Sequence, residues 1–114
     1  MEKEEEIKNN DSQLHAEWLA SLSADIQKDV NEAVAILKEG GCSEIFVFGS
    51  LTAPQESMPN DIDLAIRGCP QGEFFRLMGR LMMSLSYPVD MINLDSADPF
   101  ARFLEKEGNL KKIA

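Results

Sequence analysis

The strand-like segment 61–66 constrains the fold more than any other stretch, because it begins with two carboxylates spaced two residues apart. Successive side chains on a strand point to opposite faces, so Asp61 and Asp63 share one face while the apolar residues that alternate with them line the other. Like charges held this close repel each other unless a cation lies between them. An exposed, solvated strand start is the simpler interpretation of an isolated Asp-x-Asp pair, since Asp is usually exposed. The rest of the chain therefore decides between a frayed strand and a cation site.

Two further apolar segments, 44–48 and 89–94, supply the other elements of a small sheet. The first is short, rich in β-branched and aromatic residues, and ends at Gly49. The second opens at Pro88 and carries a third carboxylate, Asp90, inside an apolar run. Helical patterns occupy the stretches around these strands. The sequence therefore predicts an α/β (α+β) fold with a small mixed sheet of about three core strands and flanking helices.

Apolar periodicity and capping residues predict four helices. They begin near Asp11 or Ser12, after Ser23, near Gln71 and after Asp98-Pro99. The third helix has a wide apolar face, and we expect its methionines to belong to the core. Leu14 and Trp18 on the first helix are expected to cover the domain's own core rather than to form an interface.

Chain connectivity can bring three carboxylates to one end of this sheet. If Gly49-Ser50 and Asp63 belong to one site, the first two strands must run antiparallel. The stretch 71–85 is long enough for a helical crossover, so the third strand would run parallel to the second and place Asp90 at the same end. The sequence therefore predicts that both strand-start carboxylates and Asp90 converge beside the Gly-Ser turn.

Such a cluster has the chemistry of a magnesium site. Mg²⁺ favours hard oxygen ligands, usually one or two carboxylates together with waters and substrate phosphates. Gly49 lets the backbone approach a phosphate closely, and the amides of a helical turn opened by Ser50, with its hydroxyl, can donate to that phosphate. These parts fit in-line attack on a metal-bound phosphate, in which two ions stabilise the attacking and leaving oxygens. Asp61, Asp63 and Asp90 are therefore the candidate metal ligands and catalytic residues.

The pattern of Gly49-Ser50, Asp61-Ile-Asp63 and, after a helix, Asp90 resembles the minimal nucleotidyltransferases of the DNA polymerase beta superfamily. The resemblance covers most of the chain, from the second predicted helix to the last. It implies the nucleotidyltransferase fold, with Mg²⁺ bound by Asp61 and Asp63 and the nucleoside triphosphate held by Gly49-Ser50. In that family the third carboxylate, matched by Asp90, also serves the metals and can act as base toward the acceptor.

The resemblance also implies a substrate and a partner. It implies transfer of a nucleoside monophosphate, AMP from ATP, to an acceptor hydroxyl with the help of two Mg²⁺ ions. Many minimal members work beside a helical HEPN-domain protein as the antitoxin of a toxin–antitoxin pair, some by transferring AMP to a tyrosine of that partner. A HEPN-domain partner is therefore expected here, and a homo-oligomer is left open.

The loop after Ser50 departs from the family pattern. Family members often read Gly-Ser-Arg-x-Arg-Gly, whereas residues 51–54 read Leu-Thr-Ala-Pro, and no Lys or Arg occurs between Ser50 and Arg67. Without those arginines, metals and amides must neutralise more of the triphosphate charge, and Pro54 fixes φ and removes a donor. Two other interpretations stay open: a catalytically degenerate binding module that only engages a partner protein, and a plain divalent-ion site that stabilises the fold.

Length and charge place the chain among small globular domains. Its 114 residues fit one domain, predicted over residues 11–114, after a charged segment 1–10 that we expect to be disordered. The net charge of -9 argues against nonspecific nucleic-acid binding, because it repels a phosphate backbone. No apolar run approaches the length of a membrane helix and no apolar signal core is present, so we expect a cytoplasmic protein that does not bind membranes.

Cys42 and Cys69 flank the start of the first predicted strand and the end of the second. Antiparallel pairing of these strands would place the two cysteines near each other, at the sheet end far from the aspartates. Because cytosolic disulfides are rare, we expect both thiols to be reduced. Neither cysteine has metal-ligand spacing, and the lone His15 offers no partner for a zinc site or a catalytic triad.

Overall fold

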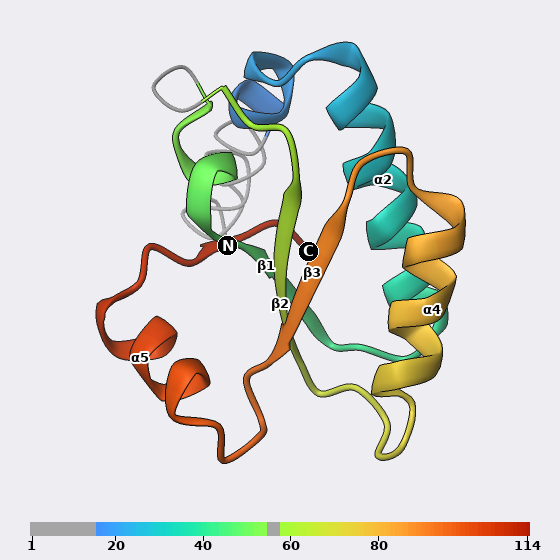
Figure 1. Ribbon diagram of the computed structural model, residues 1–114, viewed down its shortest axis with the longest axis vertical. Coiled ribbons are helices and arrows are strands. Elements are labelled where there is room, and N and C mark those ends of the chain that lie inside the picture. The colour runs from blue at the N-terminus through green and yellow to red at the C-terminus, as the bar shows by residue number, and fades with distance from the viewer. Residues whose placement is uncertain (1–15, 55–57) are drawn as a thin grey trace, which may run out of the picture.

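The computed structural model describes residues 16–54 and 58–114 (Figure 1). The predicted disordered segment 1–10 and the predicted start of the first helix lie outside these residues. That helix is present where the description begins, at residues 16–21. No helix of the described part of the chain is long and apolar enough to cross a membrane.

Four strands form one mixed sheet in the order β3-β2-β1-β4. The strands are β1 (Glu44–Val47), β2 (Ile62–Arg67), β3 (Val89–Asn93) and β4 (Lys111–Lys112). β1 pairs antiparallel with β2, and β2 pairs parallel with β3, which confirms the predicted connectivity. β4 pairs antiparallel with β1 and is missing from the sequence-based prediction, because two lysines carry no apolar pattern.

Three longer helices lie against the sheet: α2 (Ala24–Glu39), α4 (Phe74–Ser84) and α5 (Pro99–Glu107). Figure 1 shows α2 and α4 on one face of the sheet and α5 on the other. The predicted caps of α2 and α5 are confirmed. Ser23 Oγ accepts a hydrogen bond from Ile26 N at 3.3 Å, and Asp98 Oδ1 accepts one from Phe100 N at 2.9 Å.

The larger core lies between the sheet and helices α2 and α4. It contains alternate strand residues and helix leucines, among them Ile45, Val47, Ile62, Leu64, Ile66, Leu37, Leu77 and Leu81. A smaller core under α5 contains Phe48, Ala65, Leu94, Ala101 and Leu104. Because strand residues alternate between faces, Asp63 and Asp90 belong to the α5 side. α5 lies beside the ends of β2 and β3, away from the starts of these strands (Figure 1).

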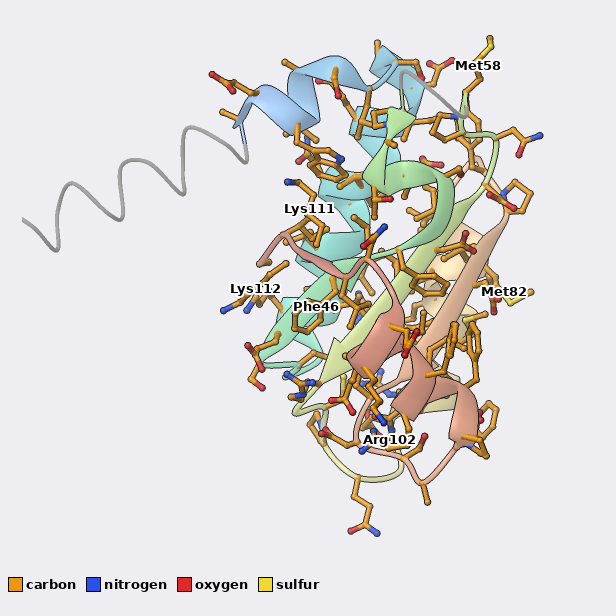
Figure 2. The ribbon with its side chains drawn as sticks, turned by 90° about the vertical axis from the view of Figure 1, so that its left-hand side faces the viewer. Phe46, Met58, Met82, Arg102, Lys111 and Lys112 are labelled. Atoms are coloured by element: carbon orange, nitrogen blue, oxygen red, sulfur yellow. A yellow bond between two sulfur atoms is a disulfide. The ribbon has the colours of Figure 1, made fainter. Side chains whose placement is uncertain are left out.

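Helix α4 is apolar on its outer side as well as on its core side. Leu77 and Leu81 are buried, whereas Phe75, Met82 and Met83 are 84%, 64% and 90% exposed. The expectation that the methionines of this helix belong to the core is therefore wrong for Met82 and Met83. A helix that meets the sheet through one stripe leaves apolar residues on its other sides in solvent. Figure 2 shows Met82 pointing outward on the β3 side of the molecule.

Cys42 and Cys69 lie close together, as the antiparallel order of β1 and β2 predicts. Glu44 at the start of β1 pairs with Arg67 at the end of β2, and the cysteines lie just outside this pair. Their Cα atoms are 3.9 Å apart, and their sulfurs form a disulfide. The expectation of reduced thiols is therefore wrong. It was based on compartment alone, whereas the strand pairing places the two side chains within bonding reach.

Candidate functional site

The parallel pairing of β2 and β3 places two of the predicted carboxylates side by side. Asp63 lies opposite Asp90 in the register of these strands. Asp61 directly precedes β2, so it lies at the same end of the sheet. Asp61 and Asp90 are exposed, and Asp63 is partly buried. The structure thus brings together the three carboxylates that the sequence singles out.

The electrostatics of this cluster show that the carboxylates repel one another. Burial raises the pKa of Asp63 above its ordinary value, and the negative charges of Asp61 and then Asp90 raise it further. All three causes disfavour the charged form of Asp63. A cation bound between the carboxylates would oppose the effect of the Asp61 and Asp90 charges on the pKa of Asp63, because a nearby positive charge favours the ionised form of a carboxyl group.

Gly49 brings the backbone into contact with Asp63. Its φ is +67°, and a Cβ built on it would lie 2.6 Å from Asp63 Oδ2. The preceding residue, Phe48, donates its backbone N–H to the carbonyl of Asp63 at 3.1 Å. The 3₁₀ turn η1 (Gly49–Thr52) begins at this point, so Ser50 lies in a helical turn beside the carboxylates, as the sequence suggests.

Gly49→Ala should lower the free energy of unfolding by about 1–2 kcal/mol, because an L-residue is disfavoured at positive φ. The new methyl group should also displace the Asp63 carboxylate, which adds to the loss. Urea unfolding measures the effect.

Gly72→Ala is the matched control, since Gly72 also has a positive φ but a Cβ there meets nothing within 4 Å. We expect a smaller loss at Gly72. Equal losses in the two variants would show that the contact between Gly49 and Asp63 contributes nothing.

The loop that departs from the family pattern turns its first residue into the core. Leu51 is 0% exposed and belongs to the larger core. Its carbonyl accepts a hydrogen bond from Trp18 Nε1 at 2.7 Å. Trp18 is itself buried in that core, which confirms the expectation for this residue, whereas Leu14 lies outside the described residues. The position where the family often carries an arginine therefore contributes packing, not charge, to this site.

The donor set fits a hard divalent cation whose remaining ligands come from elsewhere. Within residues 16–54 and 58–114, no group of three His, Cys, Asp or Glu side chains is arranged to hold a metal ion. Mg²⁺, however, usually takes only one or two protein carboxylates and completes its shell with waters and substrate phosphates. Asp63 and Asp90 on paired strands, with Asp61 beside them, supply oxygens of this kind.

Solved structures with a similar fold include two of one toxin–antitoxin complex. The crystal structure of the toxin–antitoxin MntA–HepT matches with a TM-score of 0.54 and 20% identity, over 77% of this chain and 71% of the matched chain. A mutant of that complex with two Asp-to-Glu substitutions matches with a TM-score of 0.50 and 20% identity, over 70% and 69%. The chain has the nucleotidyltransferase fold. The predicted resemblance to minimal nucleotidyltransferases is thereby confirmed at the level of the fold.

No protein-family model and no curated protein matches the chain. The nucleotidyltransferase fold is therefore recognised through the three-dimensional arrangement of the chain. One feature of the sequence indicates that Leu51 is buried: it is an apolar residue directly after Ser50.

Proposed function

We propose that this chain is a Mg²⁺-dependent nucleotidyltransferase that transfers AMP from ATP to a hydroxyl of a partner protein. The register that sets Asp63 opposite Asp90, beside Gly49, is the observation that carries this proposal. A carboxylate cluster that raises the pKa of its central member is poised to gain from a cation. Asp61 and Asp90 are exposed, so both carboxylates can be reached from solvent.

Each site residue has a role in this reaction. Asp61, Asp63 and Asp90 would hold Mg²⁺, which, when bound, neutralises the phosphates and stabilises the attacking and leaving oxygens. Gly49 lets the chain approach the triphosphate, and Ser50 donates to its oxygens. Asp90, which is exposed, accepts the proton of the acceptor hydroxyl. A bond forms between the acceptor oxygen and the α-phosphorus, the bond to the departing pyrophosphate breaks, and AMP remains on the acceptor.

The proposed acceptor is a tyrosine of a helical HEPN-domain partner, with this chain as the antitoxin of the pair. Support comes from the matched structures, which are of a toxin–antitoxin complex. The two substituted aspartates of the mutant complex are two residues apart, which is also the spacing of Asp61 and Asp63. We further propose that the protein acts in the cytoplasm as a single domain over residues 11–114, without nonspecific binding to nucleic acid.

A binding module that engages a partner without transfer is the second candidate. Leu51 favours this candidate. It stands where family members often place an arginine near the triphosphate, and it is buried, so it offers the phosphates no charge. The same surfaces would serve both candidates, so ligand binding has to separate them.

Titration calorimetry with Mg²⁺ and ATP tests the proposal. We expect ATP to bind only when Mg²⁺ is present, and label from α-labelled ATP to appear on a protein acceptor. Binding of neither ligand would support the binding module, and binding of Mg²⁺ without ATP would support a plain structural ion site. Asp25→Asn, which removes an exposed charge from the first turn of α2, is the control and should behave as the wild type.

A further inference from the structure

Asp29 of α2 is the one polar residue among the buried residues of the described part of the chain, and only 1% of its surface is exposed. Burying a carboxylate is unfavourable unless it is hydrogen-bonded or paired. The surrounding positions of α2, such as Ile26, Val30 and Ala33, are apolar and belong to the core. An acidic side chain at this position therefore needs a hydrogen-bond partner inside the protein.

The carboxylate of Asp29 holds the segment that leads into β3. Its Oδ2 accepts a hydrogen bond from Tyr87 N at 2.7 Å. The carbonyl of the next residue, Pro88, accepts a hydrogen bond from Ile62 N at 2.8 Å. Residues 87–88 are thus fixed from two sides, by a side chain of α2 and by the backbone of β2.

Both hydrogen bonds end beside the candidate site. Ile62 lies between Asp61 and Asp63, and Asp90 follows two residues after Pro88. Pro88 has no N–H to donate, so the N–H of Tyr87 is the last backbone donor before β3 begins. The position of residue 87 therefore controls how β3 enters its pairing with β2. A slip of one residue would turn Asp90 to the opposite face of the sheet.

We propose that Asp29 is a positioning residue for the carboxylate site, acting through Tyr87 and Pro88 to set Asp90 opposite Asp63. This inference rests on the proposed function for its catalytic meaning. Asp29 belongs to α2, which lies on the face of the sheet opposite to Asp63 and Asp90. Its action depends on the hydrogen bond that its side-chain oxygen accepts from the Tyr87 amide.

The test compares Asp29→Ala with the conservative Asp29→Asn, which keeps a side-chain oxygen that can accept from Tyr87 N. We expect Asp29→Ala to lower Mg²⁺ affinity and AMP transfer by about ten- to a hundredfold, as loss of a supporting contact behind a metal ligand does. Asp29→Asn should restore most of both. If Asp29→Ala does not fold, Asp29→Ser, whose shorter side chain cannot reach the Tyr87 amide, replaces it.

Leu37→Ala controls for a role in stability alone, since Leu37 is fully buried in the same helix and the same core. We expect it to lower the melting temperature while the folded protein keeps its Mg²⁺ affinity. An Asp29→Ala protein that is folded and binds Mg²⁺ as the wild type does would overturn the proposal. So would an equal loss of Mg²⁺ affinity in Leu37→Ala.

Backbone NMR contacts between residues 62–63 and 89–90 give a readout that needs no activity. We expect Asp29→Ala to lose these contacts and Leu37→Ala to retain them. A wild-type protein that binds neither Mg²⁺ nor ATP would refute the proposed function, and the NMR contacts would still decide whether Asp29 sets the strand register. Retained contacts in Asp29→Ala would refute that role of Asp29.

Discussion

On the proposed function, Asp63→Asn should lower the rate of AMP transfer at least about a hundredfold, and it should make the metal-free protein more stable. Removal of one preorganised electrostatic contact typically lowers catalytic rates by about 10²- to 10³-fold, and Asp63 is the central carboxylate of the proposed site. In the metal-free protein, the same change removes a charge that burial and two neighbouring carboxylates disfavour. A label-transfer assay and thermal melting without metal measure the two effects.

The stabilisation should depend on pH. The pKa of Asp63 is raised above its ordinary value of 3.8, so the folded state holds this proton more tightly than the unfolded state. The wild-type protein therefore loses stability as the pH rises through the raised pKa, whereas the asparagine variant does not. The difference in melting temperature should be largest at neutral pH and disappear below the ordinary value.

Mg²⁺ should reverse the order of stability, because it stabilises the wild-type carboxylates and not the variant. Asp25→Asn, an exposed charge removal on α2, should show neither the pH-dependent gain nor the loss of transfer. A large loss of stability in metal-free Asp63→Asn would contradict a metal-site role for this residue, since it would mean that the charged carboxylate supports the fold.

Reduction of the disulfide between Cys42 and Cys69 should lower the free energy of unfolding by about 3.5 kcal/mol on the chain-entropy model. The bond joins residues 27 positions apart, and the unfolded chain gains conformational freedom when that loop opens. Urea unfolding with and without a reducing agent measures the change.

The double variant Cys42→Ala/Cys69→Ala is the control for this prediction. Its unfolding should not respond to the reducing agent, and its stability should be close to that of the reduced wild type. Thiol titration of unfolded, unreduced wild type should find no free thiol. Two reactive thiols per chain, with an unfolding midpoint that reduction leaves unchanged, would contradict the bond.

The strand order and the meeting of the carboxylates could be predicted because both follow from connectivity. The connection between β2 and β3 is long enough for a helical crossover, and the parallel pairing that such a crossover allows places Asp90 opposite Asp63. The caps at Ser23 and Asp98 could be read for a similar reason, since each depends on a side chain and a nearby backbone amide.

Features that depend on distant contacts could not be predicted from local pattern. β4 contains only Lys111 and Lys112, and it is a strand because it pairs with the edge of β1. Met82 is apolar yet exposed, because the contact of α4 with the sheet uses a different stripe of the helix. The buried Asp29 gives no sequence signal either, since its partner is a backbone amide 58 residues away.

The two edges of the sheet have unlike chemistry, and this limits how copies of the chain can assemble. One edge is β4, whose two lysines discourage pairing with a further strand. The other is β3, which carries no lysine and has β2 as its strand neighbour in the described residues. A sheet open at one edge accepts one more strand. If two copies paired through β3, the open edge of each copy would be covered by the other. Such an assembly is closed as a dimer and cannot extend into a fibre.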